Sequence, residues 1–231
     1  MKKIFHLLIL ITTSLLLSQC YKSQLKPSGT YSGHDYVDLG LSVKWATCNI
    51  GATKPNEYGN YFAWGETKTK KNYSWENYKY CNISDTSILK YCNDSIYATD
   101  NLADSITILE PEDDIAVHCW GKKWRMPTKI ELNELKEKCD WKWIKLDGVK
   151  GYLITSRIEG YTNRSIFLPA SGFKWENSLE EIGSYGVYWS SSLDTELSFF
   201  AHYIYFQPKE VNLGDYEFAR DFGLTVRPVY P

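Results

Sequence analysis

The chain has 231 residues, with 26 Lys and Arg against 28 Asp and Glu, so its formal net charge is only -2. A charge this small, without any long basic run, excludes a nucleic-acid binder that works through a broad basic field. Hydrophobic residues make up 43% of the chain, which is too apolar for a disordered protein, and the aromatic fraction of 16% is the unusual value. The length allows one large or two small domains.

Residues 1–19 are predicted to be a bacterial export signal. Lys2 and Lys3 precede a mostly apolar stretch, residues 4–17, that is too short to span a bilayer comfortably. The stretch ends in Leu-Ser-Gln-Cys20, a pattern typical of the lipobox at which the Cys thiol receives a lipid and the chain is cleaved. The alternative is an ordinary secretory signal followed by an incidental Cys.

Lipidation at Cys20 would attach the protein to the membrane, because no later apolar run is long enough to cross a bilayer. Residues 20–34 are predicted to form a tether and residues 35–231 a single domain. We therefore expect an outer-membrane lipoprotein of the cell envelope. The lack of acidic residues directly after Cys20 leaves the periplasmic and the surface orientation open.

The first part of the domain alternates short strand-like segments with turns rich in Gly, Asn and Pro. Strands are expected at residues 36–40, 43–47 and 60–65. Residues 66–108 are polar and irregular and show no apolar face of useful size, so they are predicted to be a long surface excursion.

Two helices are expected next. The first is predicted to begin at Pro111 and to end near Trp120, with acidic residues in its first turn. The second begins at a capping box between Thr128 and Glu131. Its approximate apolar stripe is formed by Ile130, Leu132, Leu135 and Cys139.

Strands resume after the second helix, at residues 151–156, 165–169, 186–191, 199–206 and 223–228. This order, strands and then two helices and then a long antiparallel run, predicts one domain of the α+β class.

Five cysteines remain after Cys20, and an odd number leaves at least one thiol free or paired between molecules. Cys81 and Cys92 flank a polar loop and are one candidate disulfide, and Cys48 and Cys139 are the other. The alternative is that all five are small, buried apolar side chains. No Cys-x-x-Cys is present, which argues against a zinc knuckle.

Several motifs in consecutive order resemble the Fibrobacter succinogenes major paralogous domain, and together they span most of residues 36–230. They are VDLGL (37–41), KWATCNIGA (44–52), YGNYFAWGE (58–66), EPEDD (110–114), WRMPT (124–128), SIFLPASG (165–172), YWSSS (188–192) and GLTVRPV (223–229). The resemblance implies a distant relation to the formylglycine-generating-enzyme group and a C-type-lectin-like fold. Such a fold packs two helices on a twisted antiparallel sheet and has long ordered loops. The family occurs mainly in exported proteins and lipoproteins, and it implies no particular activity.

No enzyme is predicted. The sequence has no Gly-x-Ser-x-Gly elbow, His-Glu-x-x-His pair or phosphate loop. His118 and Cys119 are neighbours on a helix and so point apart, and His202 is expected to be a satisfied sheet histidine. The resemblance to formylglycine-generating enzymes does not extend to their late pair of cysteines, because no Cys follows Cys139. No cofactor and no metal are predicted, since the acids around Glu110 are explained by the helix start.

Binding through aromatic side chains is the function that remains. Trp175, Tyr185 and Tyr188 are predicted to lie on connected surfaces near a late hairpin, where rings could stack on the faces of sugars. Most other rings are expected in the core, including Trp45, Trp64, Trp124 and Trp189, and Arg125 and Arg227 are expected to pair structurally. The sequence thus predicts a non-catalytic binding module for a glycan or a protein partner. The alternative is an envelope enzyme of unknown chemistry.

Overall fold

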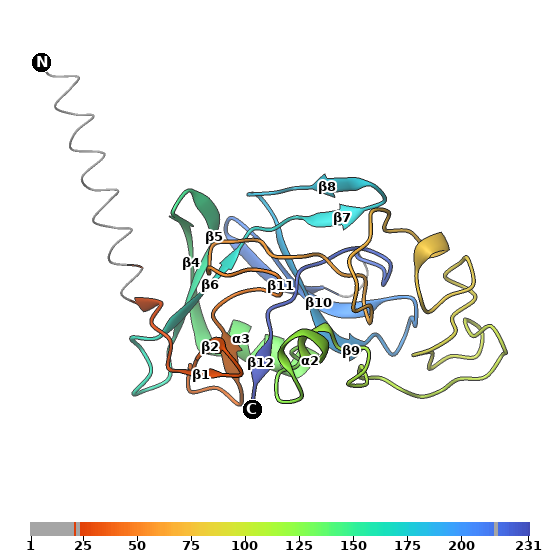
Figure 1. Cartoon of the computed structure of the whole chain (residues 1–231), viewed down its shortest axis with the longest axis horizontal. Helices are drawn as coiled ribbons and strands as arrows, with labels where there is room; N and C mark the ends of the chain where they lie inside the picture. The colour runs from red at the N-terminus through yellow and green to blue at the C-terminus, as the bar shows by residue number, and fades with distance from the viewer. Residues whose placement is uncertain (1–20, 22–23, 215–216) are drawn as a thin grey trace, which may run out of the picture.

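The computed structural model describes residues 21, 24–214 and 217–231, so Cys20 and the predicted signal lie outside the described residues. The described residues form small antiparallel sheets and two α-helices, which lie together in the lower part of Figure 1, and this confirms the α+β class. The first sheet has the strand order β1 (Gly29–Tyr31), β2 (His34–Val37), β3 (Lys44–Ala46) and β12 (Val229–Tyr230). It joins the beginning of the domain to its end.

Three further sheets build the rest of the domain. One has the order β4 (Cys139–Leu146), β5 (Val149–Ser156), β6 (Ser165–Pro169), and another β11 (Glu210–Gly214), β10 (Ala201–Gln207), β9 (Gly186–Leu193). The hairpin of β7 (Phe173–Trp175) and β8 (Ser178–Glu180) lies at the top in Figure 1, on the side of the molecule away from the helices. One 3-10 turn, η1 (Trp75–Asn77), lies in the loop-rich region.

The folded domain begins earlier than predicted. β1 and β2 pair in register from Gly29 with Tyr36 to Tyr31 with His34. β1 and the first residue of β2 thus lie in the segment predicted to be a tether, residues 20–34. The His34 ring also stacks on Trp120, with centroids 3.9 Å apart and planes at 10°. The prediction failed because strands of three and four residues are too short to show a reliable alternation.

The helices are α2 (Ile115–Trp120) and α3 (Lys129–Lys138). α2 begins four residues later than predicted, because the Asp114 side chain caps it by accepting the amides of residues 116 and 117. The capping box of Thr128 and Glu131 at the start of α3 is confirmed. The predicted stripe is wrong at Ile130, which is 80% exposed.

The core is dominated by rings, as predicted. Trp45, Trp64, Trp124 and Trp189 are all fully buried. The indole N–H of Trp64 donates to the Ser190 carbonyl at 2.8 Å, in the part of β9 where the register with β10 shifts.

Residues 66–108 contribute to this core, contrary to the prediction. Tyr73, Tyr78, Tyr80 and Tyr91 in this segment are all buried. The Tyr73 and Tyr78 hydroxyls donate to backbone carbonyls at 2.6 and 2.7 Å. The segment follows no strand or helix period, so its sequence pattern did not reveal that its tyrosines face inward.

Four of the five late strands predicted, at residues 151–156, 165–169, 186–191 and 199–206, correspond to β5, β6, β9 and β10. The strands β4, β7, β8, β11 and β12 were not expected. Residues 223–228 form single bridges rather than a strand, including one between Leu224 and Phe62. The chain here runs between several loops, so its hydrogen bonds go to different partners in succession.

Arg227 lies in this stretch and is 1% exposed, which confirms its structural role. Its guanidinium donates to Asn49 Oδ1 at 2.8 Å and to the carbonyls of Ala46, Thr47 and Phe167 at 2.9–3.0 Å. One side chain therefore joins the first sheet, an adjoining loop and β6.

We predict that Arg227→Lys lowers the free energy of unfolding by about 3 kcal/mol or more, because one ammonium cannot reach four buried acceptors in different directions. Urea denaturation monitored by tryptophan fluorescence measures the change. Arg157→Lys, at a side chain 53% exposed, serves as the control and should stay within about 0.5 kcal/mol of wild type. Equal losses in the two variants would contradict this role for Arg227.

Candidate ligand-binding surface

Five partly exposed rings form a connected row, which we call the aromatic strip: Trp175, Phe222, Phe173, Tyr185 and Tyr205. Trp175 and Phe222 are stacked, with centroids 6.3 Å apart and planes at 6°. The next centroid distances along the row are 6.2, 6.5 and 5.6 Å. The strip crosses from the β7–β8 hairpin to β10.

The hairpin presents its rings by strand alternation. Phe173 and Trp175 lie on one face of β7, and Lys174 points the other way, over the rings of Tyr61 and Tyr73. At the base of the hairpin Gly172 has φ 63°, and a Cβ there would lie 1.9 Å from the Glu180 carbonyl oxygen. Only glycine fits this close approach.

Phe218 supports the strip from below. It is 1% exposed and lies 4.7 Å from Phe173 and 5.5 Å from Phe222 between ring centroids. It also contacts Tyr203 on β10 at 5.2 Å. The exposed rings therefore rest on a buried ring and are held in place before any ligand arrives.

Arg220 anchors the segment that carries Phe218 and Phe222. Its guanidinium is fully buried and donates to the carbonyls of Lys90, Tyr91 and Ser198 at 2.8–2.9 Å. Its Nε–H donates to the Tyr78 hydroxyl at 2.9 Å. The support of the strip is thus tied to the long 66–108 segment.

Polar groups accompany the rings. The Tyr185 hydroxyl donates to Glu217 at 3.1 Å, and the Tyr205 hydroxyl donates to Glu210 at 3.3 Å. Burial and the nearby Glu217 carboxylate raise the pKa of Tyr185, so its phenol stays neutral. Hydrogen bonds from Gln207 and other neutral donors lower the pKa of Glu210, so that carboxylate stays charged. Charged acceptors and neutral donors therefore lie beside apolar faces.

The structure places the three predicted ligand-binding residues differently. Trp175 is 51% exposed and Tyr185 is half-buried, and both belong to the strip. Tyr188 is wrong as a surface ring, because it is 1% exposed and its hydroxyl donates to the Pro169 carbonyl at 2.7 Å. It lies on β9, which is buried along its whole length. Sequence reasoning missed Phe173, although its position two residues before Trp175 on a strand could have indicated a shared face.

Two more strip members, Phe222 and Tyr205, could not have been found from local spacing. Phe222 comes from a loop and reaches Trp175 only through tertiary packing. Tyr205 lies on β10 between two buried residues, Ile204 and Phe206.

The two predicted disulfides are not formed. Cys48, Cys81, Cys92, Cys119 and Cys139 all carry free thiols. Cys81 and Cys92 donate instead to backbone carbonyls, at 2.8 and 3.1 Å. Burial raises the pKa of Cys139 to about 12, so its thiol is not a nucleophile at neutral pH. The alternative interpretation, that the cysteines are small buried side chains, holds for Cys92 and for Cys139.

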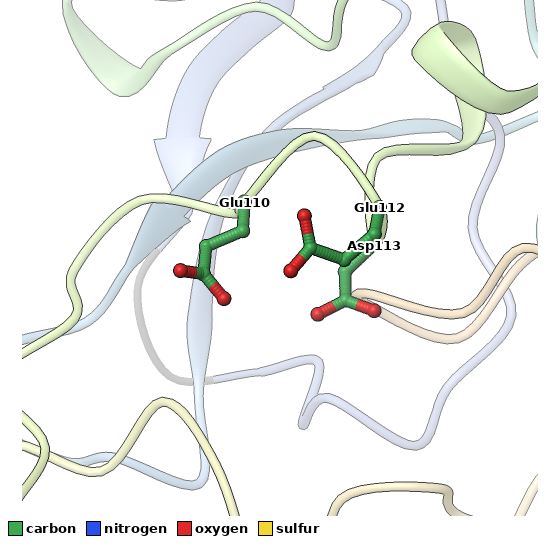
Figure 2. A group of neighbouring side chains, drawn as sticks. All are labelled: Glu110, Glu112 and Asp113. Carbon is green, nitrogen blue, oxygen red and sulfur yellow. The ribbon is translucent and has the colours of Figure 1, made fainter.

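Glu110, Glu112 and Asp113 bring three carboxylates within 4.8 Å of one another, and Figure 2 shows them converging at the turn before α2. The Lys90 ammonium lies 2.5 Å from Glu110 and 2.7 Å from Asp113. Burial alone would raise the pKa of Asp113, but hydrogen bonds from Lys90 and tyrosine hydroxyls hold it well below its usual range. This cluster is an ion-pair network with its own cation.

A cavity of about 660 Å³ lies beside α2, lined among others by Asp114, His118 and Arg125. Burial raises the pKa of Asp114 to about 6. Both of its oxygens are already used, since they accept the amides of Ala116 and Met126 at 2.8 Å. Arg125 is likewise paired as predicted, with Glu131 Oε2 at 2.7 Å from Nη1.

His202 on β10 is 7% exposed and is satisfied, as predicted. Its Nδ1 lies 3.8 Å from an Asp194 oxygen, and its Nε2 lies 3.3 Å from the Lys129 ammonium. These residues form a polar contact between β10 and the start of α3.

Comparisons with protein-family models, with curated proteins and with solved structures each give no match. In the described part of the chain, no helix has the length and apolar character needed to cross a membrane.

Asp221 lies between Arg220 and the strip residue Phe222 and is 3% exposed. Its Oδ1 has no hydrogen-bond partner among the described residues. Burial raises its pKa to about 7, and the nearby Lys70 ammonium lowers it only in part. Because the folded state holds this proton more tightly than the unfolded chain, stability falls as pH rises from about 4 to about 7.

We predict that Asp221→Asn removes this loss, since the amide is neutral at every pH. The variant should gain stability relative to wild type as pH rises through 4–7, by at most about 1.4 kcal/mol for each unit of pKa shift. Urea denaturation of both proteins at pH 4, 5, 6, 7 and 8 gives the difference. Parallel stability profiles would show that Asp221 does not carry a raised pKa.

Proposed function

We propose that this protein is a lipid-anchored, non-catalytic binding module of the cell envelope, and that the aromatic strip is its ligand surface. The carrying observation is the row from Trp175 to Tyr205, five rings that are exposed in part and supported by a buried ring. Soluble domains ordinarily bury such rings, and an exposed connected set marks an interaction site.

A glycan or a protein partner suits the strip. Flat ring faces stack on sugar rings or on apolar side chains, and the Glu210 and Glu217 carboxylates accept hydrogen bonds from hydroxyl or amine groups. The surface is open, and each ring is fixed by packing, so little side-chain entropy is lost on binding.

An envelope enzyme is the second candidate, favoured by one observation, the cavity beside α2 with its raised-pKa acid Asp114. Three amide hydrogen bonds hold that carboxylate in its capping position. A catalytic acid needs an oxygen free to reach a substrate, so the cavity supports catalysis less well than the strip supports binding.

The proposal extends to the membrane anchor and the family. The export signal with Cys20 supports lipid attachment, and the ordered motifs support membership of the Fibrobacter succinogenes major paralogous family with a C-type-lectin-like fold. The two helices and antiparallel sheets are compatible with that fold.

We predict that Trp175→Ala lowers the affinity of the protein beginning at Tyr21 for any glycan that it binds by about tenfold, because truncating a Trp hot spot that the ligand covers costs more than about 1 kcal/mol. A glycan array identifies the ligand and titration measures the change. Trp143→Ala, a half-buried ring on β4 outside the strip, is the control and should bind like wild type. Loss of binding in the control alone would place the ligand elsewhere.

We predict that cells expressing the full chain incorporate radiolabelled palmitate into it, and that Cys20→Ser abolishes the label because the acceptor thiol is gone. Gel autoradiography of the immunoprecipitated protein measures incorporation. Cys48→Ser keeps Cys20 and should retain the label. Palmitate label on the Cys20→Ser protein would contradict lipid attachment at Cys20.

A further inference from the structure

Three carboxylates lie on the same side as the rings of the aromatic strip. Glu180 on β8 is paired with Phe173 on β7, and residues directly opposite in an antiparallel pair share a face. Glu210 on β11 is likewise in register with Gln207, on the face that carries Tyr205. Glu217 is fixed to Tyr185 by its hydrogen bond. Acids therefore lie beside three rings of the strip, Phe173, Tyr185 and Tyr205.

These acids lack a cationic partner in the described part of the chain. Glu210 accepts from the neutral groups of Gln207, Tyr205 and Asn212, and Glu217 accepts from a phenol. The cation nearest in sequence to the rings, Lys174, lies on the opposite face over buried tyrosines. The hairpin also carries Glu176 and Glu181, both exposed. The negative charge at the strip is left for a ligand to balance.

Rings and carboxylates attract the same kind of group. The faces of Trp and Tyr rings attract ammonium and guanidinium groups through the ring quadrupole, and a carboxylate beside the ring adds a charge-assisted hydrogen bond. An anionic ligand would meet uncompensated repulsion from the same acids. Ring centroids follow one another at 5.6–6.5 Å. Alternate side chains of an extended peptide are separated by about 6.7 Å.

From these contacts we propose that the aromatic strip binds a basic, extended segment of a protein partner, whose Lys or Arg side chains lie over the rings and between Glu180, Glu210 and Glu217. The inference rests on the proposed function, because it names the partner of the same surface. The segment's alternate side chains face the strip, and the intervening ones face solvent.

The test uses the chain from Tyr21, which keeps every described residue, and an eight-residue peptide that alternates Lys and Thr. Controls are the same peptide with acetylated lysines, a Glu and Thr peptide, a neutral chito-oligosaccharide and its deacetylated, amine-bearing form. Calorimetry at 50 and 500 mM salt measures binding, and intrinsic tryptophan fluorescence gives a second readout. The protein variants are Trp175→Ala, the double variant Glu180→Gln with Glu217→Gln, and Glu159→Gln as a control at an exposed acid outside the strip.

The Lys peptide should bind, with affinity falling at least tenfold on acetylation of its lysines, in the double variant and in Trp175→Ala. Binding should also weaken at 500 mM salt, and Glu159→Gln should match wild type. Equal binding of the acetylated or acidic peptide, or no binding of the Lys peptide, would overturn the inference. Preference for the deacetylated oligosaccharide over the peptide would overturn it in favour of an amino sugar.

The failures of the two proposals differ. If the neutral oligosaccharide binds and Trp175→Ala abolishes its binding while the Lys peptide does not bind, the strip is a ligand surface and only the basic partner is wrong. If the Lys peptide binds Trp175→Ala as tightly as wild type, the strip is not the site and both proposals fail.

Discussion

The buried guanidinium of Arg220 is the contact on which the arrangement of the domain depends. Its N–H groups donate to the Lys90, Tyr91 and Ser198 carbonyls and to the Tyr78 hydroxyl, and its Cζ atom lies 4.8 Å from the Trp64 ring centroid. A loop-rich protein has many carbonyls that no helix or sheet can pair. One planar group with five N–H donors pairs several of them at once and fixes segments that are far apart in sequence.

This constraint explains how a surface of rings stays in place. Arg220 lies two residues from both Phe218 and Phe222, so the contact that fixes the 66–108 segment also positions the support of the strip. Exposed rings would ordinarily collapse onto the core. Here the core positions beneath them are already filled by Phe218 and Tyr203, so the upper rings remain at the surface. The same segment carries Glu217, so Arg220 also helps to position a carboxylate beside the rings.

Sequence reasoning predicted what local patterns encode. The α+β class, the capping box at Thr128, β6 at residues 165–169 and the burial of four tryptophans are confirmed, because capping, alternation and turn residues act over a few positions. Sequence reasoning could not predict that Tyr188 is buried, that Phe222 stacks on Trp175, or that the tyrosines of residues 66–108 pack in the core. Each of these depends on contacts between distant segments. The disulfide prediction was wrong because the spacing of two cysteines in the sequence does not determine the distance or orientation of their thiols in the fold.

Hydrogen exchange in an Arg220→Lys variant tests the central claim most directly. If the guanidinium ties these segments together, amide protection in residues 78–92 and 217–223 should fall together, while protection in the β4–β5–β6 sheet stays near wild type. A uniform loss of protection across the domain, or a loss confined to the residues beside position 220, would contradict the account.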